Sequence, residues 1–202
     1  MFPLGSVLFP FEMLPLHVFE ERYRLMIAAC LASDHRFGVV LIARGSEVGG
    51  GDVRHDRGTM ATIEVASPTP DGRYGVLARG GGRLRVHSWL DDAPYPHALV
   101  SIDAAEDSGD LAVEIASTLA RLRGLREIWA ELEEGPPLPE HLALGADFNE
   151  QIWRLCSATP LGALDRQRVL EADAPLERLA LLDEQIAERR SDYEALLRER
   201  LE

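Results

Sequence analysis

The first 33 residues combine short apolar runs, prolines and one amphipathic segment. Residues 2–4 and 14–19 are apolar and contain prolines. Because proline fixes φ and lacks a backbone N–H, these runs predict short, edge-like strands. From residue 23 to 31, apolar residues recur at the helical interval, which predicts a helix that begins near Glu20.

Further strands are predicted as far as residue 103. Residues 37–43 are a continuous β-branched run, typical of a central strand buried on both faces. Residues 59–65 alternate and place Ala61, Ile63 and Val65 on one face. The glycines at 80–82 are interpreted as a turn between two strands. The strands expected after residue 58 are 59–65, 74–79, 83–89 and 97–103.

Near residue 104 the spacing of apolar residues changes from two to 3.6. Four helices with short connections follow, one of them beginning at Thr159 with Pro160 in its first turn. The fold class is therefore α+β, a small antiparallel pseudo-barrel of about six strands and one helix followed by a four-helix bundle. The change of period divides the chain into residues 1–106 and residues 107–202.

The charge of the chain excludes some classes of function. The net charge is −13, with ten arginines against fourteen carboxylates up to residue 107 and eleven against twenty beyond it. Nucleic-acid binding requires a basic surface, so no nucleic-acid partner is expected. No apolar run approaches the roughly 20 residues of a membrane span, and a cytoplasmic protein without a membrane partner is expected.

All 21 basic residues are arginines, and the chain contains no lysine. A Walker A loop needs a lysine on the phosphates, and a Ser-Lys dyad needs an amine that can lose its proton. An arginine supplies neither. We therefore expect no catalytic residues for nucleotide hydrolysis or peptide cleavage, and no cofactor.

Several segments in order resemble a known family. FPLGSVLFP followed by LPLHVFEERYR resembles the start of the substrate-binding domain found at the N-terminus of Lon proteases and in free-standing relatives. The segment at 58–89 resembles the middle strands of that domain, and APYPHALV its last strand. Near the end of the chain, the family's helical pattern is matched by Pro160, Gln167, Leu170, Glu171 and residues 177–179.

The resemblance implies a PUA-like barrel and a non-enzymatic module that recognises polypeptides. We expect it to bind extended apolar segments of unfolded or partner proteins in a groove between barrel and helices. A Lon-type or other ATP-dependent protease is a possible partner. The acidic surface is expected to disfavour acidic clients. The candidate lining residues are Phe11, Met13, Trp89, Tyr95 and Trp129.

An alternative is a small-molecule or anionic-ligand protein that uses the pocket of the barrel. The residues in question are Arg79, Arg83, Arg85 and His87, three of them in an outward row on one predicted strand. The alternative gains support if these side chains converge on a pocket, and loses it if they pair with carboxylates.

The remaining candidates are interpreted as structural. His17 and Glu20 have a spacing seen in metal sites, but a strand end and a helix start lie between them, so we interpret them as a packing and capping pair. Asp52, His55 and Asp56 lack a fourth ligand in the sequence around them, and no metal is predicted. The structural residues are Pro15, His17, Glu20, Arg22, Tyr23, Gln167 and Arg178.

Overall fold

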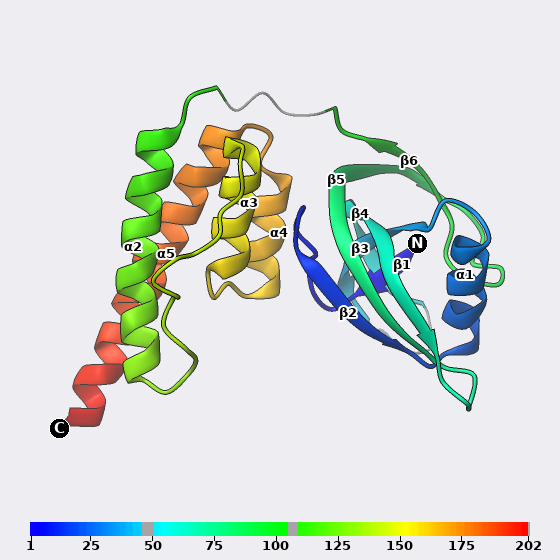
Figure 1. Ribbon diagram of the computed structural model, residues 1–202, viewed down its shortest axis with the longest axis horizontal. Helices are drawn as coiled ribbons and strands as arrows, with labels where there is room; N and C mark the ends of the chain where they lie inside the picture. Colours follow the sequence, from blue (N-terminus) through cyan, green and yellow to red (C-terminus); the bar gives the residue numbers. More distant parts are fainter. Residues whose placement is uncertain (46–50, 105–108, 202) are drawn as a thin grey trace. The chain divides into compact units, whose positions relative to one another are not determined.

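The computed structural model describes residues 1–45, 51–104 and 109–201. The chain divides into two compact units, Met1–Ala105 and Glu106–Glu202 (Figure 1). Each unit is described by itself. The boundary expected after residue 106 lies outside the described residues.

The first unit is a curled sheet of six strands with one helix. Along the sheet the order is β1-β3-β4-β5-β2, and β6 also pairs with β5. Strand β1 runs parallel to β3, so the sheet is mixed, whereas the other pairs are antiparallel. The predicted barrel-like unit of about six strands is confirmed. The elements are β1 (Phe2–Leu4), β2 (Met13–Val18), α1 (Glu21–Leu31), β3 (Arg36–Arg44), β4 (Val53–Pro68), β5 (Tyr74–Trp89) and β6 (Ala98–Ile102).

Two long strands produce the curl of the sheet. Strands β4 and β5 each have 16 residues, and β5 pairs with β2 along its first half and with β6 along its second (Figure 1). The buried stripe of α1, which includes Tyr23, Met26 and Ile27, packs into the concave face of the sheet. Strand β3 is buried from Phe37 to Leu41, as its continuous apolar run predicted.

The predicted turn at residues 80–82 is wrong, because β5 continues through these glycines. The connection between β1 and β2 crosses the strand at this point, and the Phe11 amide donates a hydrogen bond to the Gly80 carbonyl at 2.8 Å. A Cβ on Gly80 would lie 2.1 Å from the Phe9 carbonyl oxygen. The glycine is therefore needed for a close approach of two backbones rather than for a turn.

The second unit contains the helices α2 (Ala112–Glu131), α3 (Phe148–Ala158), α4 (Ala163–Glu171) and α5 (Pro175–Leu201). Helices α2 and α5 run parallel, since Arg121 pairs with Asp183 at 2.5 Å and Arg200 donates to the Leu132 carbonyl at 2.8 Å. Thr159 ends α3 instead of beginning the next helix, so that predicted helix start is wrong. Among the described residues, no helix is both long and apolar enough to cross a membrane.

Candidate binding surface

Four apolar side chains lie together on the outer face of the sheet, across β2, β5 and β4. Pro15 pairs with Leu77, and Leu77 pairs with Val65, so the three form one cross-strand row. Met13 lies two residues before Pro15 and therefore points to the same face. The exposed fractions are 44% for Met13, 36% for Leu77 and 53% for Val65, and Pro15 is also exposed. We call Met13, Pro15, Val65 and Leu77 the outer patch.

A shift of strand register turns Val65 outward. Ala61 and Ile63 are buried, as their alternation predicted, but the pairing of β4 with β5 shifts between Ile63 and Val65. One extra residue in a strand moves the following side chains to the opposite face. The prediction that Val65 shares a face with Ala61 and Ile63 is therefore wrong.

Strand β2 forms the edge of the sheet beside the outer patch. Within the described residues, β2 ends the strand order and pairs with β5 alone. The Gly80 amide donates to the Glu12 carbonyl at 2.8 Å, and the alternation of an antiparallel ladder then directs the backbone groups of Met13, Pro15 and His17 away from β5. Pro15 has no N–H, so it removes one donor from an edge that otherwise offers hydrogen bonds to an extended chain.

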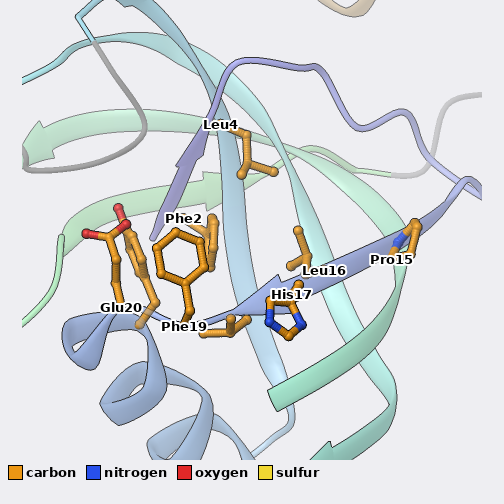
Figure 2. A pocket seen from close by; sticks show the side chains of 9 residues that line it. Phe2, Leu4, Pro15, Leu16, His17, Phe19 and Glu20 are labelled. Carbon is orange, nitrogen blue, oxygen red and sulfur yellow. The ribbon is translucent and has the colours of Figure 1, made fainter. Parts of the chain in front are cut away.

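An apolar cavity of about 190 Å³ opens beside the same edge (Figure 2). Its walls are Phe2 and Leu4 of β1, residues 15–18 of β2, and Phe19, Glu20 and Tyr23 at the start of α1. Strands β1 and β2 are the two ends of the strand order, and the curl of the sheet brings them to one cavity. An apolar cavity of roughly 150 Å³ holds a benzene ring, so this one is large enough for a single apolar side chain. We call it the edge pocket.

The polar side of the edge pocket is built at the start of α1. Glu20 occupies the N-cap position, but its carboxylate accepts from Arg22 Nε at 3.2 Å and from no backbone amide of the helix. The predicted capping role of Glu20 is therefore wrong. The Tyr23 ring stacks on Phe2, with ring centres 4.2 Å apart. Burial raises the pKa of Tyr23 to about 12, against the opposing charge of Arg22, so its hydroxyl is neutral at pH 7. His17, also a wall of the pocket, is exposed.

The second half of β5 carries a polar, paired cluster on the face of the sheet opposite to the outer patch, because the pairing with β4 shifts by one residue between Gly80 and Arg83. Arg57 of β4 donates to both carboxylate oxygens of Asp103, at 3.0 and 2.6 Å. Arg83 of β5 lies 3.0 Å from the same carboxylate. Both arginines are buried, so one carboxylate forms ion pairs with two guanidinium groups that are shielded from water.

The four residues of the anionic-ligand hypothesis lie along β5 in different surroundings. Arg83 belongs to the ion-pair cluster just described, and His87 Nε2 lies 2.9 Å from the Ser101 hydroxyl. Arg85 is exposed on the same half of the strand, whereas Arg79 lies in the first half, beside the outer patch. None of these four residues lines the edge pocket.

Trp89 lies in a second, more polar hollow. The Arg54 guanidinium covers its ring at 4.6 Å, and Arg54 also pairs with Asp52 at 2.5 Å and with Asp92 at 2.6 Å. Burial alone raises the pKa of Asp52, but the hydrogen bond and charge of Arg54 outweigh it and hold that pKa below the ordinary value. The cavity here is about 440 Å³ and open, and its lining arginine, Arg54, is already paired with Asp52 and Asp92.

The remaining aromatic candidates belong to different segments of the chain. Tyr95 stacks on His97, with ring centres 4.5 Å apart, and packs against the core of the sheet unit. Phe11 lies in the connection that crosses β5, with a φ of 63°. Trp129 lies on α2 in the helical unit. Of the five predicted lining residues, Met13 is the one that belongs to the outer patch.

Gln167 and Arg178 lie inside the helical unit. Arg178 is fully buried, its guanidinium carbon lies 3.8 Å from the centre of the Trp153 ring, and it donates to the Ala172 carbonyl at 3.0 Å. Gln167 donates to the Glu171 carboxylate at 2.7 Å. In the part of the chain that the structure describes, no three histidine, cysteine or acidic side chains are grouped so that they could hold a metal ion.

Leu77, Phe2, Leu4 and Phe19 were not predicted as site residues. The sequence carries no local signal for the outward direction of Leu77, because its neighbours Val76 and Ala78 are also apolar. The signal for the edge pocket is absent, because Phe2 and Leu4 become its walls only after the curl of the sheet brings β1 to β2.

The structure thus defines a class of domain, a curled mixed sheet with an open apolar edge and one helix, followed by a helical unit. The family model of the ATP-dependent protease La (LON) substrate-binding domain matches residues 1–188, and the chain belongs to this family. The resemblance seen in the sequence is confirmed. The family is that of a substrate-binding domain, not of a protease or ATPase domain.

Individual proteins agree with this assignment. Lon protease 2 of Herpetosiphon aurantiacus is 28% identical over 89% of this chain and 22% of its own length, so the chain spans about a fifth of that relative. The crystal structure of a Lon N-terminal domain protein from Xanthomonas campestris has a TM-score of 0.67 at 28% identity, covering 90% of this chain and 94% of that one. The N-terminal domain of the Mycobacterium avium complex Lon protease, at 18% identity, has a TM-score of 0.62 over 92% of this chain and 96% of that one and shows the same fold.

Proposed function

We propose that this chain is a non-catalytic module that binds extended apolar segments of unfolded or partner polypeptides along strand β2. One observation carries the proposal: the outer patch and the edge pocket meet along β2, a sheet edge that no other strand of the described residues covers, and they share Pro15. This location lies wholly within the sheet unit and replaces the groove expected from the sequence. Membership of a substrate-binding family supports the same class of function.

The geometry favours an extended segment over a folded one. A segment that adds beside β2 can bond to the outward backbone groups of Met13 and His17. Successive side chains of a strand point to opposite faces, so alternate side chains of the client would cover the outer patch and enter the edge pocket. The expected recognition pattern is therefore apolar residues in an extended chain, with little dependence on their identity.

The binding is expected to be weak. Burial of apolar surface contributes about 25 cal/mol per Å², and the patch and the pocket together offer only a few side chains. Ordering a flexible client costs several kcal/mol, and Pro15 leaves one backbone bond unmade. We therefore expect a Kd on the order of micromolar. Weak binding suits a module that hands its client to a Lon-type or other ATP-dependent protease, the partner that we propose.

The test is binding of a fluorescently labelled, reduced and carboxymethylated model protein, measured by anisotropy. Leu77→Ser should weaken the binding about tenfold, because it removes the central side chain of the row. Leu99→Ser is the matched control, since Leu99 is 58% exposed on β6 of the same sheet and lies outside the outer patch. Thermal unfolding followed by circular dichroism checks that both variants are folded.

Two results would overturn this proposal. One is unchanged binding by a folded Leu77→Ser variant. The other is a dimer in sedimentation experiments that Leu77→Ser, but not Leu99→Ser, dissociates, because the outer patch would then be the interface between two copies of the chain.

A further inference from the structure

Arg79 is a cation in an apolar setting. It points outward from β5 two residues after Leu77, and its register partners are Met13 on β2 and Thr62 on β4. The side chain is exposed, and over residues 1–45, 51–104 and 109–201 no ion pair or hydrogen bond engages its guanidinium. Its neighbours on this face are therefore Met13 and Leu77 of the outer patch and, on the other side, Thr62.

The surroundings of Arg79 differ from those of Arg85, six residues further along β5. The pairing of β5 with β4 shifts by one residue between Gly80 and Arg83, so Arg85 lies on the opposite face of the sheet. Arg85 lies between Ser101 of β6 and Arg57 of β4, in a row without apolar side chains. A client that covers the outer patch excludes water around Arg79, whereas Arg85 stays in a polar, solvated row. An ion pair strengthens when water is excluded from it. Only Arg79 is therefore placed to select a client by charge.

We propose that Arg79 makes the outer patch selective for apolar segments that carry a carboxylate. The inference rests on the proposed function and names the class of client: an extended chain in which a side-chain or C-terminal carboxylate lies beside the apolar residues. The carboxylate would pair with the Arg79 guanidinium in a two-pronged contact, which fixes the position of the client on the sheet as well as adding attraction.

The net charge of −13 suggests the opposite preference, and the two effects act at different ranges. Charges separated by more than about 8 Å are largely screened at physiological ionic strength. The diffuse acidic surface therefore slows the approach of an acidic client only slightly. A direct contact with Arg79 is screened much less once the client covers the patch. The local cation, rather than the total charge, is expected to decide the preference.

The experiment compares two labelled ten-residue peptides that differ at one position. Both contain alternating leucine and valine, and one carries a central aspartate where the other carries asparagine. The wild-type protein should bind the aspartate peptide about threefold to fivefold more tightly, the range of a partly exposed ion pair. Arg79→Gln should reduce this ratio to about one. Arg85→Gln is the matched control and should keep the ratio, and 0.5 M NaCl should reduce it.

The outcomes separate the two proposals. If neither peptide binds the wild-type protein, the proposed function fails and this inference fails with it. If both peptides bind equally, or if Arg79→Gln keeps the ratio, the selectivity is wrong while the apolar binding surface stands. Loss of the ratio in Arg85→Gln as well would assign the effect to the general charge of the sheet and would also overturn the role of Arg79.

Discussion

The two halves of strand β5 share one backbone but surround their side chains in opposite ways. In the first half, Leu77 lies between two exposed apolar neighbours, Pro15 and Val65. In the second half, Arg83 is buried against Asp103, which also holds a second buried arginine. The pairing of β4 with β5 shifts by one residue between Gly80 and Arg83, so Leu77 and Arg83 lie on opposite faces of the sheet. On the face of Leu77, the second half instead carries Leu84 and Val86, which are buried in an apolar cluster with Val40.

The two halves differ in whether the sheet itself provides partners for their side chains. Charged groups that leave water need a partner, and the second half supplies it from within the sheet. Apolar groups of the first half stay in water although they form a contiguous row, and such rows on a protein surface mark sites of interaction. The first half is thus the side on which a further chain would gain most by binding.

The largest expected effect concerns the junction of the two halves. Gly80→Ala would place a Cβ 2.1 Å from the Phe9 carbonyl oxygen, a backbone atom that cannot move aside alone. We expect a loss of about 3 kcal/mol in the free energy of unfolding, measured by urea titration. Gly75→Ala on the same strand is the control, because its nearest contact is the Ser67 carbonyl oxygen at 4.0 Å. Equal stability of the two variants would mean that the crossing at Gly80 is loosely packed.

The next effect tests the second half of β5, where buried arginines pair with Asp103. Asp103→Asn keeps the shape of the side chain but removes the charge that serves two buried arginines. Because Asp103 is itself 24% exposed, solvent offsets part of the loss, and we expect a destabilisation of about 2 kcal/mol. Asp71→Asn is the control, since its pair with Arg73 is exposed to solvent and should contribute much less than the pairs of Asp103. Chemical denaturation gives the free energy of unfolding of both variants. Equal losses in this free energy would contradict the contrast between the two halves of β5.

Part of the sheet could be predicted from local pattern alone. Burial of β3 from Phe37 to Leu41 followed from an unbroken apolar run. The outward direction of Leu77 did not follow, because Val76, Leu77 and Ala78 are all apolar. Local pattern is sufficient where a side chain's environment depends on the two faces of its own strand.

The rest could not be predicted, because it depends on pairing between distant segments. Val65 faces outward because of a register shift against β5, and the glycines near residue 80 lie in a strand because residues 9–11 cross it. Asp103 and Arg57 are 46 positions apart, so nothing near either residue indicates their pair. Single-strand alternation carries no information on such contacts.

A smaller effect tests the first half of β5, which carries Leu77 of the outer patch. Leu77→Thr keeps a residue that suits a strand but removes apolar surface from the outer patch. Because Leu77 is already 36% exposed, we expect a change below about 1 kcal/mol in the free energy of unfolding. Binding of an apolar fluorescent dye to the folded protein should decrease. A loss above about 2 kcal/mol would instead show that Leu77 packs as a core residue, and the outer patch would lose its central member.

The smallest effect concerns the exposed hydrogen bond between His87 and Ser101, on the second half of β5. Water competes for both partners, so we expect His87→Ala and Ser101→Ala each to change the free energy of unfolding by less than about 0.5 kcal/mol. The double variant, measured in the same urea titration, isolates their coupling, which should be close to zero. A coupling above about 1 kcal/mol would show that polar pairs at the surface of this half, and not only the buried cluster around Asp103, hold the second half of the strand in place.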